Sequence, residues 1–192
     1  MNNFSDKPHR RSLRLSHYDY SQSAAYFVTI CIKNSENLLG DIQDNVMNLN
    51  QFGQVVKDIW HSLDTRYKEV ILDEFVIMPN HIHKIIFIDN PVEIIHELSL
   101  PEERRKMLLP KVVGYFKMNS AKLINQLRGT QGQSVWQKNY YEHIIRDEVS
   151  LTKIREYIVN NPLKWHQDIE NQQVKPSQEE LQFWQSFGRK DL

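Results

Sequence analysis

The chain has little of three things that commonly decide the class of a protein: cysteine, net charge and long apolar runs. One cysteine among 192 residues, Cys31, leaves no disulfide framework and no multi-cysteine zinc site within one chain. The 24 acidic and 24 basic residues balance, so the total charge gives no attraction to nucleic acid. The longest apolar runs have the length of strands, and no stretch resembles a signal peptide or a membrane span. We therefore expect a cytoplasmic protein with no membrane partner and with Cys31 as a buried thiol.

Positive charge is nevertheless concentrated in two stretches of this neutral chain. Residues 1–15 contain four basic residues and one acid, and residues 104–128 contain seven basic residues and no acid. A local positive field can bind an anionic partner whatever the total charge, although charge runs taken alone are more often solvated helix faces. The candidate nucleic-acid contacts are Arg10, Arg11, Arg14, Arg104, Arg105, Lys117, Lys138 and, for stacking on unpaired bases, Trp136.

The hydrophobic pattern predicts an α+β fold. A strand, a hairpin, a helix, two more strands and then further helices are typical of an antiparallel sheet with helices packed against it. Residues 135–146 are aromatic and mixed in character, and the pattern assigns them no element. The strands are expected at 26–32, 70–76 and 81–88, the hairpin at 38–49, and the helices at 51–65, 92–98, 112–127, 148–161 and 177–187.

Two histidines, His81 and His83, open the strand at 81–88, directly after the turn signal Met78-Pro79-Asn80. Side chains two apart on a strand point to the same face, with Cα atoms roughly 6.5–7 Å apart. Two imidazoles at that spacing can bind one metal ion, while Ile82 faces the other side. We expect both histidines to be partly exposed at a cleft. The alternative is a pair of ordinary polar residues at the end of a strand.

Tyr157 and Asn161 lie four residues apart in the helix expected at 148–161, so they occupy one face of it. Pro162 stops this helix. Taken alone, a helical tyrosine most often packs against its neighbours, and an asparagine at a helix end most often caps it. These two residues therefore need a partner elsewhere in the chain before they indicate a function.

Several segments together resemble a known family. Residues 78–83 resemble the His-hydrophobic-His signature of the HUH single-strand nucleases, and residues 155–162, Arg-Glu-Tyr-Ile-Val-Asn-Asn-Pro, resemble their one-tyrosine catalytic helix. One branch of that family, the REP-associated tyrosine transposases, is similar over about residues 10–168. The further matching segments are residues 10–15, 18–20, 25–29 and 136–146.

The resemblance implies a ferredoxin-like antiparallel sheet of the HUH-nuclease type that carries the histidines, with the tyrosine helix laid across it. It implies that His81, His83 and Asn161 bind Mg²⁺ or Mn²⁺, and that Tyr157 attacks DNA to form a covalent 5′-phosphotyrosine. Tyr140 and Tyr141 are rival nucleophiles by residue type, but neither has an amide one helical turn away.

The family also implies partners and a domain organisation. Single-stranded or hairpin DNA is the expected partner, and the expected location is the cytoplasm, in association with the nucleoid. The REP-associated branch favours a monomer with its site in one chain, whereas other one-tyrosine transposases swap the tyrosine helix in a homodimer. We expect one transposase domain over 1–168, with a basic N-terminal arm, and a polar C-terminal tail with a short helix over 169–192.

Lys84 departs from the family pattern, because relatives usually have glycine after the second histidine. A lysine there could narrow the site or contact a phosphate, and an inactive, domesticated hairpin-binding protein is therefore one alternative. A non-catalytic module like an RNA-recognition domain is another, but it gives no reason for the histidine pair. A 2H-type phosphodiesterase needs two His-x-Thr/Ser motifs, and the chain has none.

Overall fold

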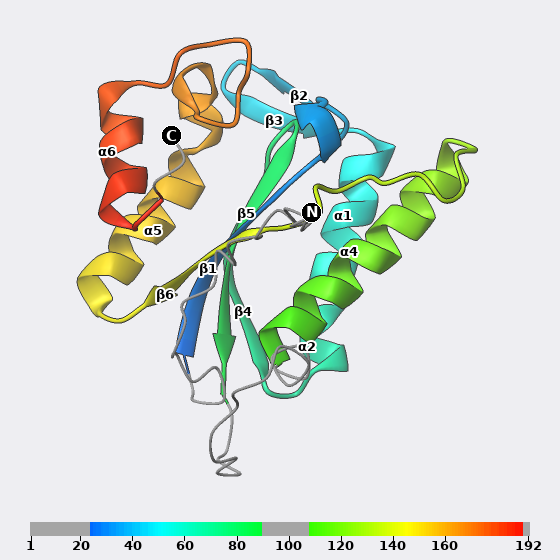
Figure 1. Cartoon of the computed structure of the whole chain (residues 1–192), viewed down its shortest axis with the longest axis horizontal. Helices are drawn as coiled ribbons and strands as arrows, with labels where there is room; N and C mark the ends of the chain where they lie inside the picture. The colour runs from blue at the N-terminus through cyan, green and yellow to red at the C-terminus, as the bar shows by residue number, and fades with distance from the viewer. Residues whose placement is uncertain (1–23, 90–107, 190–192) are drawn as a thin grey trace, which may run out of the picture.

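A four-stranded antiparallel sheet forms the centre of the computed structural model, which describes residues 24–89 and 108–189 (Figure 1). Each pair of neighbouring strands is antiparallel. Helices follow the first and third of these strands in the sequence, and the spatial order places the first and third strands in the middle of the sheet. This is the ferredoxin-like arrangement that the sequence predicted. In spatial order the strands are β4 (Val70–Ile77), β5 (His81–Ile88), β1 (Ala24–Cys31) and β6 (Tyr141–Ile145).

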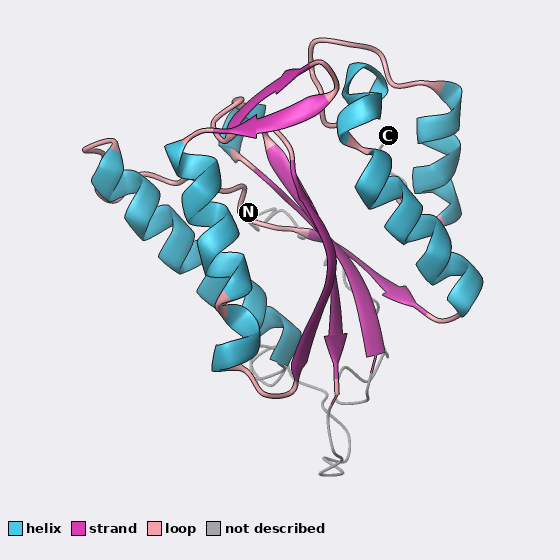
Figure 2. Cartoon of the chain, turned by 180° about the vertical axis from the view of Figure 1, so that it is seen from behind, coloured by secondary structure: helices cyan, strands magenta, loops and turns pink. Residues whose placement is uncertain are grey.

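Helices cover both faces of the sheet, as the two opposite views show (Figures 1 and 2). One face carries α1 (Gln51–His61), α2 (Leu63–Arg66) and α4 (Leu108–Leu127). The other face carries α5 (Glu148–Asn160) and α6 (Gln178–Ser186). Shorter elements complete the chain: the 3₁₀ turns η1 (Lys33–Ser35) and η2 (Pro162–Gln167), and the hairpin of β2 (Gly40–Gln43) and β3 (Val46–Leu49).

Polar caps set the start of three helices. The side chain of Asn50 accepts hydrogen bonds from the backbone of Phe52 and Gly53 at the start of α1. Asp147 caps α5 in the same way, and Ser177 caps α6. Each cap satisfies backbone N–H groups that have no partner inside the helix.

Alternation along the central strands separates two cores. The side chains of Tyr26, Val28 and Ile30 in β1 join the core beneath α1 and α4. Phe27 and Ile85 belong to the second core, with side chains of α5 and α6. Odd-numbered residues of β1 and β5 thus face α5 and α6, and this face also holds His81 and His83.

The predicted elements agree with the structure apart from their ends. The helix expected at 51–65 is two helices, α1 and α2, and the helix expected at 112–127 begins at Leu108. The unassigned stretch 135–146 contains β6. The helix expected at 92–98 lies outside the described residues. Within the described ranges, no helix is both long and apolar enough to cross a membrane.

Candidate metal and nucleophile site

His81 and His83 lie side by side at the start of β5, as their spacing predicted. Their Nε2 atoms are 2.9 Å apart, and their ring centroids are 4.4 Å apart. We expected both to be partly exposed at a cleft, and this was wrong, because both are fully buried. The reason is aromatic cover from later in the chain: the ring of Trp184 lies 5.6 Å from that of His83, and the ring of Trp165 lies 6.1 Å from that of His81.

Each imidazole is held through its other nitrogen. His81 Nδ1 lies 2.8 Å from Oδ1 of Asn80, and His83 Nδ1 lies 2.8 Å from the hydroxyl oxygen of Thr29. The sheet register pairs Thr29 with His83 across β1 and β5. Contacts of this kind fix the orientation of metal-binding histidines, because they direct the opposite nitrogen at the metal.

Asp168, which the sequence did not suggest, is the third member of the cluster. Ligand atoms of His81, His83 and Asp168 lie within 4.8 Å of one another, and Asp168 Oδ2 is 3.8 Å from His81 Nε2. The predicted ligand Asn161 is also buried at this place, and its Nδ2 donates a hydrogen bond to Asp168 Oδ2 over 2.8 Å. The amide of Asn161 thus holds the carboxylate of Asp168.

These donors fit a divalent metal ion. Two imidazoles and a carboxylate supply nitrogen and anionic oxygen ligands. Asn161 Oδ1 is buried and has no hydrogen-bond partner among the described residues, which would be costly unless a cation takes the free lone pairs. His81, His83 and Asp168 are therefore the best candidates to hold the metal that the family implies, with the Asn161 oxygen as a fourth donor.

Tyr157 of α5 lies beside this cluster, with its ring centroid 5.3 Å from that of His83. Its hydroxyl donates a hydrogen bond to Oε1 of Glu180 over 2.8 Å, and the indole N–H of Trp184 donates to the same oxygen over 2.7 Å. Phe183 stacks on the Tyr157 ring at a centroid distance of 3.9 Å. The family's nucleophile position is thus held by three residues of α6.

Burial shifts the ionisation of this site toward neutral forms. It raises the pKa of Tyr157 well above its ordinary value, and the negative charges of Asp168 and Glu180 add to that effect. Burial also raises the pKa of Glu180, and it lowers the pKa of His83, with a further contribution from the adjacent His81. In this closed arrangement Tyr157 is a neutral phenol.

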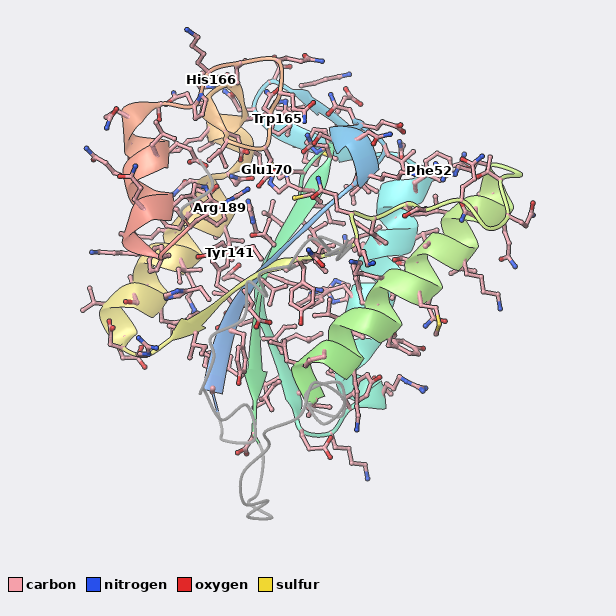
Figure 3. The ribbon with its side chains drawn as sticks, in the orientation of Figure 1. Phe52, Tyr141, Trp165, His166, Glu170 and Arg189 are labelled. Carbon is pink, nitrogen blue, oxygen red and sulfur yellow. The ribbon has the colours of Figure 1, made fainter. Side chains whose placement is uncertain are left out.

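The end of the chain holds α6 in place. A guanidinium nitrogen of Arg189 lies 2.6 Å from Oε1 of Glu170, and the Arg189 guanidinium carbon is 4.6 Å from the centroid of the Trp184 ring. Figure 3 shows Arg189 and Glu170 close together between α6 and the sheet, with Tyr141 nearby. A groove of about 380 Å³ between α5 and α6 reaches Tyr157 and Glu180, but its lining residues do not include the histidines or Asp168.

Comparison with known proteins places the chain in a family. No protein-family model matches the chain. An uncharacterized protein of Haemophilus influenzae is 44% identical over 169 residues, which are 83% of this chain and 92% of that protein, so the two belong to one family.

A second protein of that organism, provisionally named a REP-associated tyrosine transposase, is 25% identical over 76% of this chain and 74% of its own length. The solved structure of a REP-associated tyrosine transposase bound to a REP hairpin shares the fold, with a TM-score of 0.52, 18% identity, and coverage of 79% of this chain and 74% of that one.

The chain is similar to a REP-associated tyrosine transposase in sequence and in fold.

Lys84 lies away from the histidines. It belongs to the opposite face of β5, where its ammonium nitrogen is 3.9 Å from the centroid of the Phe116 ring and 5.0 Å from that of Trp60. Strand alternation is the cause, because Lys84 is two residues from Ile82 and one from His83, so it points to the face of Ile82. Both expectations for Lys84, a narrowed site and a phosphate contact, were wrong.

The predicted DNA contacts have four different outcomes. Lys117 donates hydrogen bonds to the carbonyl oxygens of Gln137, Lys138 and Asn139, so it ties α4 to the segment before β6. Trp136 is buried, with its N–H donated to Ser120, and the expectation that its ring is exposed for base stacking was wrong. The side chain of Lys138 is exposed. Arg10, Arg11, Arg14, Arg104 and Arg105 lie outside the described residues.

Sequence reasoning missed Asp168, Glu180 and Thr29. Asp168 follows the 3₁₀ turn η2, where no periodicity relates one residue to another. Glu180 belongs to the expected helix α6, but the sequence does not show that this helix packs against Tyr157. The sequence assigned 169–192 to a polar tail with a short helix; the helix is α6, and its side chains pack against Tyr157. The division of the chain at residue 168 stays a prediction. Thr29 could have been found from pairing, because β1 is the expected antiparallel neighbour of a histidine strand.

Proposed function

We propose that this protein is a metal-dependent single-strand DNA endonuclease and strand transferase that acts through Tyr157, at DNA able to form hairpins. The observation that carries the proposal is the position of Tyr157 on the face of the sheet that holds His81, His83 and Asp168. A packing tyrosine would need no such neighbours. The named relatives, one of them solved with a REP hairpin, support hairpin DNA as the partner class.

In the proposed reaction, the phenolate oxygen of Tyr157 attacks the phosphorus of the scissile linkage. The bond from phosphorus to the 3′ oxygen breaks, leaving a free 3′-hydroxyl on one strand end and a 5′-phosphotyrosine on the other. A metal held by the histidines and Asp168 would supply positive charge for the phosphate oxygens. A 3′-hydroxyl can reverse the attack and join strands, so the transfer needs no ATP.

We propose that the protein acts as a monomer with its site in cis. DNA as the partner would place the protein with the nucleoid. Access to the site depends on the covering helix α6, because its side chains fill the space over Tyr157 and His83. A scissile phosphate can reach both only after α6 shifts.

That closure favours a second candidate function, a hairpin-binding protein of the same fold that does not cut. The Tyr157 hydroxyl donates a hydrogen bond to the carboxylate of Glu180 and keeps its proton, because burial raises the pKa of Tyr157 well above its ordinary value. The two candidates agree on DNA binding and differ only in covalent chemistry.

A covalent-adduct assay distinguishes them. Wild type, Tyr157→Phe, Tyr141→Phe and Tyr140→Phe are incubated with labelled single-stranded hairpin DNA and Mn²⁺, and DNA-linked protein is detected on a denaturing gel. Tyr141→Phe is the matched control, since its hydroxyl is also engaged in this core, donating to the Phe187 carbonyl oxygen. We expect only Tyr157→Phe to lose the adduct. An adduct formed by Tyr157→Phe would disprove the assignment, and its absence in the wild type would favour the non-cutting candidate.

A further inference from the structure

The two histidines are held by different kinds of hydrogen-bond partner, and this difference has a chemical consequence. Asn80 contacts His81, and Thr29 contacts His83. An amide oxygen only accepts a hydrogen bond, whereas a hydroxyl group can donate or accept. All four side chains are buried, so solvent does not substitute for either partner.

The orientation of the Asn80 amide is fixed by its own contacts. Its Nδ2 lies 2.8 Å from the carbonyl oxygen of Glu170 and 3.3 Å from that of Ser35, and both oxygens can only accept. A flipped amide would place Oδ1 against these two carbonyl oxygens. The oxygen must therefore face His81, whose Nδ1 must carry the proton that joins them. In a neutral imidazole this leaves Nε2 of His81 with a free lone pair.

The short contact between the rings then decides the state of His83. The two Nε2 atoms are 2.9 Å apart, which is a hydrogen-bond distance, so one of them must carry the proton that is donated to the other. His81 Nε2 has none when its ring is neutral, so His83 Nε2 carries it, and His83 Nδ1 is bare. With both rings neutral, the hydroxyl of Thr29 therefore donates to His83 Nδ1 in the metal-free protein.

A metal ion would need the lone pairs of both Nε2 atoms. We propose that Asn80 locks His81 in its metal-ready tautomer, while Thr29 is a hydroxyl switch that lets His83 change tautomer when a divalent cation binds. The proton on His83 Nε2 leaves to water, a proton from water is taken up at Nδ1, and the Thr29 hydroxyl turns from donor to acceptor. The imidazole gains and loses one proton, so its charge does not change. This inference rests on the metal site of the proposed function.

The first test reads the tautomers directly. Long-range ¹H–¹⁵N NMR of histidine-labelled full-length protein shows which ring nitrogen carries hydrogen. In the metal-free protein we expect the proton on Nδ1 of His81 and on Nε2 of His83, and with Mg²⁺ on Nδ1 of both. A proton on Nδ1 of His83 without metal would overturn the switch, and a bare Nδ1 of His81 would overturn the lock.

The second test measures Mn²⁺ binding by calorimetry. Thr29→Val removes the hydroxyl at nearly constant shape, so we expect an affinity about 10- to 100-fold lower than that of wild type, the usual effect of removing a partner of a metal-binding histidine. Thr29→Ser should restore binding. Ser120→Ala, which removes a buried hydroxyl on the other side of the sheet, should not change it.

Equal affinity of wild type and Thr29→Val would overturn the switch even if DNA cleavage were confirmed. A wild type that bound neither Mn²⁺ nor Mg²⁺ would overturn the metal site of the proposed function and the switch with it. In that case the metal-free spectrum would still decide whether Asn80 locks His81. The two failures are therefore distinguishable.

Discussion

At the scale of single residues, the main difference from the family-based expectation concerns the oxygen ligand of the metal site: Asp168 joins the two histidines, and Asn161 contacts Asp168. Asn161 was expected to bind metal, but its amide N–H group is used to hold the carboxylate of Asp168. A carboxylate is a charged ligand and an amide oxygen a neutral one, so the two should contribute unequally. The Asn161 oxygen keeps a supporting role.

We therefore predict that Asp168→Asn weakens Mn²⁺ binding more than Asn161→Ala does. The first change removes a negative charge from the metal position, while the second removes a neutral donor and leaves the carboxylate in place. Isothermal titration of both variants with Mn²⁺ measures the two affinities. The opposite order would return Asn161 to the role of principal oxygen ligand.

Lys84 gives a prediction about stability and pH. It is fully buried, and its ammonium nitrogen has no hydrogen-bond partner among the described residues. Burial lowers the pKa of Lys84 well below its ordinary value, and the charge of Lys117 lowers it further. The unfolded chain therefore binds a proton that the folded chain binds less well, so the free energy of unfolding falls as pH drops below about 10.4, the ordinary lysine pKa.

Lys84→Met keeps the apolar stem and removes this proton-linked cost. We expect the variant to be more stable than wild type at pH 7, with a difference that shrinks by at most about 1.4 kcal/mol per pH unit toward pH 10. Urea unfolding at a series of pH values measures it. Lys122→Met, at an exposed position of α4, is the control and should show no such trend. A difference independent of pH would mean that Lys84 is charged in the folded protein.

At the scale of elements, α6 determines whether the site is open. Its contacts with the rest of the protein are aromatic, through Trp184 and Phe183, and polar, through Glu180. Arg189, just beyond the helix, adds an ion pair to Glu170. A helix of nine residues is too short to be stable without such contacts, so weakening one of them should release it.

We predict that Arg189→Ala increases hydrogen exchange in α6, because it breaks the partly buried ion pair with Glu170. Such a pair contributes between the about 1 kcal/mol of an exposed pair and the about 3 kcal/mol lost when a buried pair is broken. The exchange of α6 amides, measured by mass spectrometry, should become about tenfold faster or more. Arg155→Ala, which removes the ion pair between α5 and Asp73 of β4, is the matched control and should leave α6 unchanged. If the proposed function holds, Arg189→Ala should also form more covalent adduct. Unchanged exchange in α6 would show that Arg189 does not hold it.

How far the sequence could predict this molecule depended on periodicity. Because regular elements have fixed geometry, strand alternation correctly placed His81 and His83 on one face of β5. Helical spacing placed Tyr157 and Asn161 on one face of α5 in the same way. The same strand alternation also puts Lys84 on the face of Ile82, away from the histidines. The expectation that Lys84 lies at the metal site came from the family pattern. Asp168 follows Pro162 and a 3₁₀ turn, where no period applies. The burial of Trp136 depends on tertiary packing, which aromatic content alone does not predict.

At the scale of the whole molecule, the protein combines a neutral total charge with a site buried by its own C-terminal helix. If the proposed function holds, association with DNA must begin outside the site. The basic stretches of the sequence offer such contacts, and the arginines at positions 10, 11 and 14 form the densest group near the N-terminus. Contacts with phosphates release counterions from DNA, so they make the affinity depend on salt.

The last prediction concerns this salt dependence. Replacing Arg10, Arg11 and Arg14 together by alanine should weaken binding to single-stranded hairpin DNA. It should also reduce the slope of log affinity against log salt by at most about 2, because each phosphate that an arginine neutralises adds about 0.7 to that slope. Fluorescence anisotropy at several salt concentrations measures the slope. Lys57→Ala combined with Lys68→Ala, at exposed positions on and beside the α1 face, removes charge away from the site and should leave the slope nearly unchanged. An equal reduction of the slope in the two variants would mean that the protein attracts DNA through its general charge and has no N-terminal contact.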